Sequence, residues 1–484
     1  MKTIKSYFIL LVLIFVLPIL SSCEDRLEEN TFTVLSPNDF FNTGDDLEVV
    51  LLSVYGELRY SDITRDAVTL QEVCTDIAFE RGGGIFTWNE PIEEFTWTTT
   101  HQWLQNSWER RYRGIFKANT VLDNADLVEM DEERRNEIIA EARFLRAFNY
   151  FLLFDFFGPV PLVTSSETEV TDRPARASEE EMISFIEDEL AAAAQGLPVT
   201  PPREQYGRPT RGAALGALAK FYMMTKKWQE AAATAKQVMD LGEYDLFIEA
   251  DRTQLFSPEN QQDNEFIFVA NMSDTPDNDT GNGWLSHVVP RGYAWEFPPR
   301  QIFAAKYKIY TAFLETFDLE DERLSAFRTE FVNTDGETII LEEDNAITLK
   351  FPEYPNQDAS RSADDFIFIR YADILLSRSE ALNEINGPNQ ESVDLLNMVR
   401  EASGVAAYQI SDFANTLDFR DAILDERGWE FHTEALRRQD LIRHDKFIQM
   451  AIERGKPAQA FQVRYPIPQT EIERNPSLVQ NEGY

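Results

Sequence analysis

The chain has 484 residues, and 43% apolar with 12% aromatic residues is a composition that excludes a disordered protein. Its 84 acidic and 45 basic residues give a net charge of −39, which argues against binding to nucleic acid or to an anionic membrane surface. With only two cysteines, Cys23 and Cys74, the chain has neither a disulfide framework nor a cysteine-based zinc site.

The first residues have the pattern of a secretory signal. Two lysines precede an apolar run from Tyr7 to Leu20, which is shorter than the roughly 20 residues that span a bilayer. Small residues then lead to Cys23, and this order resembles the lipobox of bacterial lipoproteins, whose new N-terminal cysteine carries lipid chains. We therefore predict a lipoprotein signal peptide at residues 1–22 and lipid attachment at Cys23.

An acidic segment follows the predicted cleavage site. Four of the next six residues are acidic, namely Glu24, Asp25, Glu28 and Glu29. This run resembles the export tag of Bacteroidetes surface lipoproteins, so we expect a tether at residues 23–35 and a single domain at residues 36–484. The expected location is the cell surface, lipid-anchored to the outer membrane. The alternative is an ordinary secreted protein in which Cys23 has no role.

Helical periodicity dominates the remainder of the chain. Apolar residues spaced by three or four predict a helix over Asp131–Phe157, which Gly158 and Pro159 end. A second helix is predicted over Arg211–Thr225, where Thr210 has the right chemistry to cap its first turn.

Two helix pairs are predicted around 211–242 and 366–404. The first pair continues with Trp228–Leu241; the second begins near Phe366, turns at Asn386-Gly387-Pro388 and resumes over Gln390–Ser403. Both resemble tetratricopeptide repeats, with helix-packing residues at Leu215, Gly216, Ala219, Tyr222 and Ala231. The predicted fold is therefore mainly α, a tetratricopeptide-like helical-pair scaffold or α-α superhelix with long irregular loops and minor β hairpins. The alternative is that the repeats themselves form a peptide-binding groove.

A further helix is predicted over Ile423–Phe447. Its charged residues are Glu426, Arg427, Glu430, Glu434, Arg437, Asp440 and Arg443. Glu434 with Arg438, and Asp440 with Arg443, have the spacing of ordinary ion pairs on a helix face. We interpret these residues as structural.

Two segments, 81–101 and 271–300, combine glycine, proline and asparagine with large aromatics. This composition predicts long loops, and loops of that length are usually functional or disordered. Because disordered segments are poor in tryptophan, the tryptophans here favour function. By contrast, Trp103 and Trp108, with Tyr112 and Phe116, recur at helical spacing and are predicted to lie in the core, as are Trp228 and Trp429.

The loop aromatics suggest a platform for carbohydrate. A pyranose ring stacks its C–H face on an exposed indole, and its hydroxyl groups then bond to neighbouring polar side chains. The predicted ligand-binding residues are Arg81, Trp88, Asn89, Trp284, Tyr293 and Trp295, with Asn282 a further candidate. The alternative is that these aromatics are anchors folded onto the scaffold.

Signatures of an enzyme are weak. His432 and Glu434 have the H-x-E spacing of zinc deaminases, but the partner motif P-C-x-x-C is missing. The acidic loop with Asp274, Asp277 and Asp279 lacks the glycine and glutamate positions of an EF-hand, so we interpret it as solvated. No catalytic residue, metal or cofactor is predicted. Because acidic pairs occur throughout by chance, a glycoside hydrolase with a helical scaffold stays an alternative.

An ordered set of segments resembles the SusD/RagB family of Bacteroidetes outer-membrane lipoproteins. The segments start at the lipobox and comprise 108–119, 141–150, 157–161, 207–214, 370–376, 379–383, 426–427, 438–443, 465–468, 471–472, 475–476 and 480–484. Each is weak alone, but the full set in this order is specific. The shared segments belong to the scaffold, so they indicate the family and not the ligand.

The resemblance implies a non-enzymatic binding protein used in polysaccharide utilisation. Such proteins capture oligosaccharides at the cell surface and pass them to a SusC-like TonB-dependent outer-membrane transporter. Their ligand sites are aromatic arcs on variable loops, and the two tryptophan-bearing segments fall where the family places them. Peptide capture, as in RagB-like relatives, is the alternative within this class, and a repeat scaffold without a small ligand is another.

Overall fold

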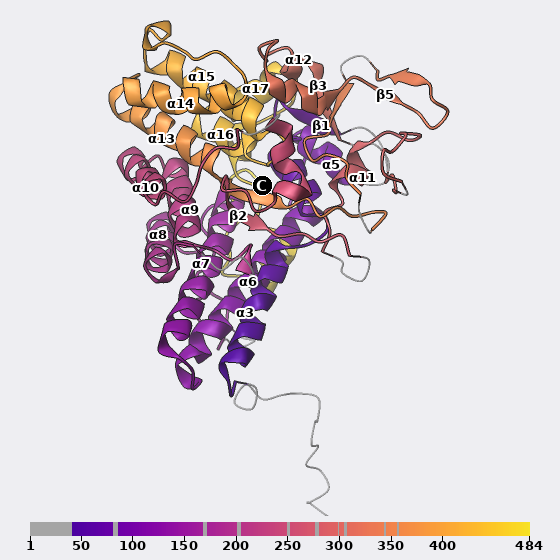
Figure 1. Ribbon diagram of the computed structural model, residues 1–484. Coiled ribbons are helices and arrows are strands. Elements are labelled where there is room, and N and C mark those ends of the chain that lie inside the picture. The colour runs from indigo at the N-terminus through magenta and orange to yellow at the C-terminus, as the bar shows by residue number, and fades with distance from the viewer. Residues whose placement is uncertain are drawn as a thin grey trace, which may run out of the picture. The chain divides into compact units, whose positions relative to one another are not determined.

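Figure 1 shows the computed structural model of the chain. It describes residues 41–484 except 81–85, 168–171, 201–204, 249–251, 276–279, 299, 304–306, 343–344 and 356–357. The chain separates into two compact units, Met1–Asn42 and Thr43–Tyr484, and the second contains every element described below. The predicted signal at 1–22, Cys23 and the tether at 23–35 lie outside the described residues.

Long helices form the first half of the scaffold. The helices of this half are α3 (Gly44–Leu58), α4 (Ile63–Gln71), α5 (Phe86–Glu93), α6 (Gln102–Asn124), α7 (Glu132–Phe157), α8 (Glu179–Gly196), α9 (Arg211–Met224) and α10 (Trp228–Asp240). Helix α3 packs on α6, α6 on α7, α7 on α8, and α8 on α9, so most neighbours in space are near neighbours in sequence.

The second half continues the helical layer. Its helices are α11 (Trp284–Val288), α12 (Thr311–Leu314), α13 (Tyr371–Asn386), α14 (Gln390–Ala402), α15 (Thr416–Phe431), α16 (Arg437–Arg443), α17 (Phe447–Glu453) and α18 (Gln469–Arg474). Helix α10 packs on α13, which joins the two predicted helix pairs α9–α10 and α13–α14. The predicted mainly α, helical-pair scaffold is confirmed.

Local capping chemistry sets the boundaries of the clearest helices. The side chain of Asp131 accepts a hydrogen bond from the N–H of Arg134 at the start of α7, and Thr210 accepts one from Ala213 at the start of α9. Helix α7 ends at Gly158, whose φ of +70° is a conformation that glycine adopts without a steric penalty. The predicted boundaries of these helices are therefore correct to within a residue.

The strands form three small antiparallel sheets. They are β1 (Ala78–Glu80), β2 (Phe266–Ala270), β3 (Tyr307–Tyr310), β4 (Phe327–Arg328), β5 (Glu330–Val332), β6 (Thr338–Ile340), β7 (Asn345–Thr348) and β8 (Phe366–Arg370). One sheet has the order β1-β3-β7-β4, a second pairs β2 with β8, and β5–β6 form a hairpin. The segment from Phe366 to Arg370 was predicted as helix, but its alternating Phe and Ile residues pair with β2, and helix α13 begins only at Tyr371.

The predicted helix Ile423–Phe447 is wrong, because three separate helices, α15, α16 and α17, occupy this region. Thr433 and Ala435 have φ values of +69° and +61°, which no α-helix accommodates. Their N–H groups donate hydrogen bonds of 2.9 and 2.8 Å to the two carboxylate oxygens of Glu72, which directly follows α4. A buried carboxylate from another segment thus ends α15.

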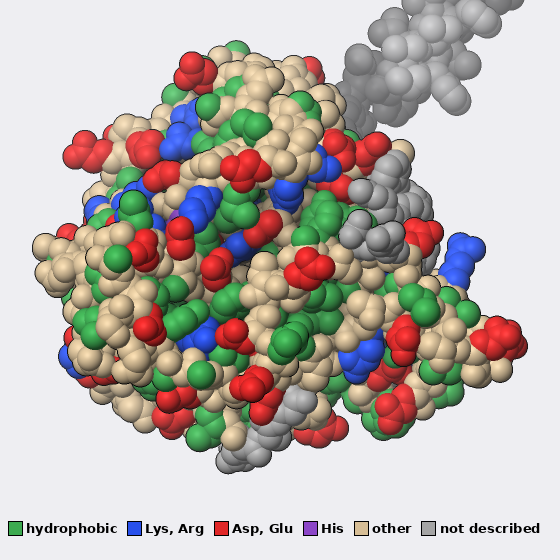
Figure 2. Space-filling model, turned by 90° about the horizontal axis from the view of Figure 1, so that it is seen from above, with side chains coloured by type: hydrophobic (Ala, Val, Ile, Leu, Met, Phe, Trp, Pro, Cys, Tyr) green, Lys and Arg blue, Asp and Glu red, His purple; other side chains and the backbone are tan. Residues whose placement is uncertain are grey.

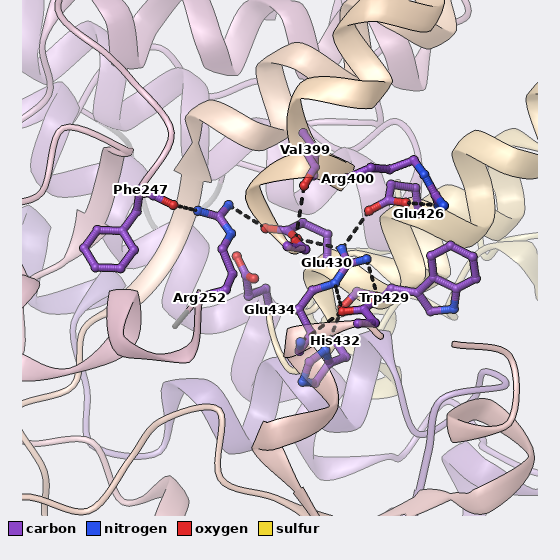
Figure 3. A network of polar contacts seen from close by, with 12 residues as sticks. Phe247, Arg252, Val399, Arg400, Glu426, Trp429, Glu430, His432 and Glu434 are labelled. Atoms are coloured by element: carbon purple, nitrogen blue, oxygen red, sulfur yellow. Dashed lines mark hydrogen bonds and ion pairs between the residues drawn. The ribbon is translucent and has the colours of Figure 1, made fainter. Parts of the chain in front are cut away.

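A buried network of ionised side chains, all from residues 252–434, surrounds Glu430 on α15, and Figure 3 shows part of it. Five cations and five carboxylates, each at most 4% exposed, compose it: Arg252, Arg323, Lys350, Arg370, Arg400, Glu265, Asp321, Glu426, Glu430 and Glu434. Glu430 is central, because its carboxylate bonds to Arg252, Arg323 and Arg370 at 2.8, 2.8 and 2.6 Å. Burial raises the pKa of Glu430, but these guanidinium groups outweigh that effect and hold it well below the usual range.

This network corrects the prediction of ordinary ion pairs on a helix face. Glu434 does not pair with Arg438; its carboxylate bonds to Arg370 and Lys350, whereas Arg438 bonds to Asp155. The pair Asp440–Arg443 does form, at 2.9 Å, but it is buried. The residues are structural, as predicted, yet they belong to the core and not to a solvated surface.

Replacing Glu430 by glutamine should lower the free energy of unfolding by about 3–5 kcal/mol, because it leaves buried guanidinium groups without their counter-charge. Urea denaturation measures this change. The matched control is Asp240→Asn, which removes an exposed pair with Lys236 and should change the free energy by less than about 0.5 kcal/mol. Equal effects of the two substitutions would contradict the role assigned to the network.

Stability should also depend on pH through Glu72. Burial raises the pKa of this carboxyl group to about 7 despite the hydrogen bonds from Thr433 and Ala435. Between pH 4.5 and 7 the folded chain therefore holds a proton that the unfolded chain releases, so this group's contribution to the free energy of unfolding falls as pH rises through that window.

Glu72→Gln should therefore reduce the decrease in unfolding free energy between pH 5 and pH 7.5, measured by urea denaturation across that range. Burial also raises the pKa of Asp365 to about 7, so part of the decrease should persist. The control Glu401→Gln, at an exposed position, should leave the profile unchanged. An unaltered profile in Glu72→Gln would show that Glu72 does not take up the proton.

Candidate functional site

Trp88 is the most exposed of the predicted aromatic contacts. It lies on α5, a helix where the sequence predicted a loop, and its side chain is 42% exposed. Its ring lies 6.0 Å from the buried ring of Trp103, centroid to centroid. His101 donates an Nε2–H hydrogen bond of 2.7 Å to the Trp88 carbonyl oxygen, and burial lowers the pKa of His101, which favours the neutral ring. The Trp103 ring thus packs against the indole and the His101 bond fixes the backbone of Trp88, while much of the indole remains exposed.

Tyr293 and Trp295 form a second aromatic group. Their rings meet edge to face at 5.2 Å, and both are half-buried. The N–H of Ala294 donates to the carbonyl oxygen of Val332 on β5, so the hairpin β5–β6 holds the segment in place. The Tyr293 hydroxyl donates to Glu353 at 2.8 Å; burial and this carboxylate together raise the pKa of Tyr293.

Arg300 adds a cation to this second group. Its guanidinium carbon lies 5.7 Å from the ring centroid of Trp295 and 5.4 Å from that of Tyr354. The sequence analysis did not select Arg300 or Tyr354. Their proximity depends on contacts between distant segments, although Arg300 is the last residue of the predicted loop 271–300.

Contacts between segments bring the two aromatic groups to one side of the unit. The side-chain amide of Asn89 on α5 donates to the hydroxyl of Tyr307 on β3, and the ring of Trp284 on α11 packs against the same tyrosine at 5.0 Å. The backbone of Asn282 pairs with Ser362, whose hydroxyl accepts a hydrogen bond from Arg300. Figure 1 shows α5, α11 and β5 on the same side.

Three predicted contacts are buried in this structure. Trp284 is 3% exposed and packs in a hydrophobic cluster with Tyr307, so its indole is not free in water as predicted. Asn89 is fully buried and bonds to Thr69 and Tyr307. Asn282 is 2% exposed and donates to the hydroxyl of Thr64. These side chains hold the segments in place, and none offers a polar group to a ligand at the surface.

Of the remaining residues that the sequence analysis selected, some lie outside the described residues, some are buried as predicted, and one is exposed. Arg81 lies outside the described residues, as do Asp277 and Asp279. Trp103, Trp108 and Trp429 are buried as predicted, whereas Phe116, predicted to lie in the core, is 53% exposed at the outer face of α6.

Charge does not mark out a single binding patch on the face that Figure 2 shows. Figure 2 shows acidic, basic and hydrophobic side chains interspersed over the face viewed from above. The described residues contain no group of three or more histidine, cysteine, aspartate or glutamate side chains placed to bind a metal ion. No helix among them combines the length and the apolar composition needed to cross a membrane.

The architecture defines the class of the protein: a scaffold of packed helix pairs whose connecting segments carry surface aromatics. Two family models match the chain, and together they span more than half of it. Residues 37–223 match a SusD-like family described as starch-binding and associating with the outer membrane, and residues 345–484 match the SusD family, which includes RagB. The chain belongs to the SusD/RagB family.

Curated relatives align along nearly the whole chain. SusD-like protein P25 of Formosa agariphila is 25% identical, over 98% of this chain and 99% of that protein. The starch-binding protein SusD of Bacteroides thetaiotaomicron is 22% identical, over 82% of each chain.

Solved structures share the fold. A laminarin-binding SusD-like protein is 24% identical and superposes with a TM-score of 0.76 over 92% of this chain and all of its own. Surface glycan-binding protein A of Bacteroides thetaiotaomicron, solved with laminarihexaose, is 19% identical, with a TM-score of 0.77 over 91% of this chain and all of its own. At these identities the likeness establishes the fold alone.

Trp284→Ala should lower the free energy of unfolding by about 3–5 kcal/mol, because it removes a buried indole and leaves a cavity. Trp88→Ala removes a partly exposed ring and should lower it by less than about 1 kcal/mol. Urea denaturation of both variants measures the contrast. A Trp284→Ala variant as stable as the parent chain would restore that residue as a candidate ligand contact.

Proposed function

We propose that this protein is a surface glycan-binding lipoprotein that captures oligosaccharides and passes them to a SusC-like TonB-dependent transporter. The observation that carries the proposal is the partly exposed indole of Trp88, which packs against the ring of Trp103 and whose backbone carbonyl bonds to His101. A rigid, partly exposed indole offers a sugar ring a flat apolar surface that loses little conformational freedom on binding.

The second aromatic group supplies different chemistry to the same ligand. Trp295 offers a further apolar face, and Arg300 beside it offers N–H donors for sugar hydroxyl groups. Arg81 is retained as a predicted contact. Relatives whose names record laminarin or laminarihexaose binding support a glycan as the ligand.

The wider proposal follows from family membership. The lipid anchor at Cys23, the surface location on the outer membrane and the transporter partner are the properties that the signal pattern and the family imply. A binding role without catalysis fits the family, and no cofactor enters the proposal.

Affinity electrophoresis against laminarin, amylopectin and other soluble polysaccharides tests the proposal. One of them should retard the parent chain, and Trp88→Ala or Trp295→Ala should weaken that binding by about tenfold or more, as truncation of a central aromatic contact commonly does. The control is Phe116→Ala, which removes an exposed ring on α6. This variant should bind the polysaccharide like the parent chain.

Three outcomes would contradict this assignment. If both tryptophan variants bind as tightly as the parent chain, the aromatic surface is not the site. If oligopeptides bind and no polysaccharide does, the protein captures peptides, and release of free sugar from a bound glycan would indicate a hydrolase.

A further inference from the structure

A cavity of about 110 Å³ lies inside the unit, bounded by α4, α6, α7, β8 and the start of α16. Aromatic side chains dominate its walls, including Trp103, Phe148, Phe151, Phe156, Phe366 and Phe368. Asn106 and Arg110 on α6 also line it, and because Asn106 is exposed, the cavity reaches the surface beside this helix. None of the proposed sugar contacts lines the cavity.

One buried acceptor in the cavity wall lacks a partner. Gln71 is 4% exposed, and its Nε2–H donates a 2.6 Å hydrogen bond to a carboxylate oxygen of Asp155. Since a carboxylate oxygen only accepts, this bond fixes the orientation of the amide, with Oε1 on its other side. Among the described residues, no group donates a hydrogen bond to Gln71 Oε1.

The two simplest occupants of the cavity, water and a hydrocarbon, each match only some of the groups that line it. Water would donate to Gln71 Oε1 and has further polar partners in the lining, among them Asp66 and Gln439, but it would leave the aromatic part of the wall without matching contacts. A hydrocarbon would match the aromatic rings but leave a buried acceptor unpaired, which is costly. An engineered cavity of about 150 Å³ holds benzene, so a single ring is the right size class.

We propose that this cavity binds a small aromatic molecule bearing one hydroxyl group. The ring packs edge to face against the phenylalanine side chains, and the hydroxyl donates its hydrogen bond to Gln71 Oε1. The cavity shares Trp103 with the support of Trp88, but it takes a different ligand, and the inference does not depend on the proposed function.

Titration calorimetry of the full chain with phenol and with toluene tests this assignment. Phenol should bind about tenfold more tightly than toluene, the ratio that one net hydrogen bond provides. Gln71→Leu should lower the affinity for phenol by about tenfold and leave that for toluene unchanged or higher.

A second variant fills the cavity without touching Gln71. Ala67 on α4 lines the cavity and is half-buried, so Ala67→Leu should abolish binding of both probes. The matched control is Ala192→Leu on α8, a half-buried position away from the cavity, which should bind both probes like the parent.

Three results would overturn the proposal. No binding of phenol at millimolar concentration would mean that the cavity holds water alone. Equal affinities for phenol and toluene would remove the role of Gln71. Undiminished phenol binding by Ala67→Leu would place the probe elsewhere on the protein.

Discussion

The fold depends on a set of charges that are tolerated in the interior only because each has its partner. Removing two ions from water costs more than a single contact returns unless the pairing is complete. Glu430 meets this condition by contacting three guanidinium groups, one of which is Arg370 at the end of β8. The network thereby joins α15 to the end of β8, which α9 and α13 also contact.

The same constraint extends to the candidate site. Just before β8, Asp365 accepts a hydrogen bond from the N–H of Met272, and Ser362 pairs with Asn282. These contacts position the chain that leads into Trp284 and α11. The aromatic surface is therefore held by buried polar contacts that run back to the centre of the molecule, which gives it the rigidity that binding by stacking needs.

Sequence patterns predicted the parts of the fold that local chemistry determines. Helix α7 begins and ends where Asp131 and Gly158 place its caps, and α9 begins after Thr210. The end of the helix at α15 could not be predicted from local sequence, because it depends on Glu72, which lies 361 residues away from Thr433. The prediction that Trp284 is exposed failed for a related reason. A tryptophan in an irregular segment can pack into the core and hold the segment in place, and the sequence alone does not distinguish this role from an exposed ring.

The separation in sequence between the network's partners has a consequence for the order of folding. Helices α6 to α9 contact mainly their neighbours along the chain, and such local contacts form quickly. Arg252 and Arg323, however, meet carboxylates that belong to α15, more than a hundred residues later. Before α15 forms, Arg252 and Arg323 have only their nearby partners Glu265 and Asp321, and Glu426 and Glu430 of α15 then complete the network.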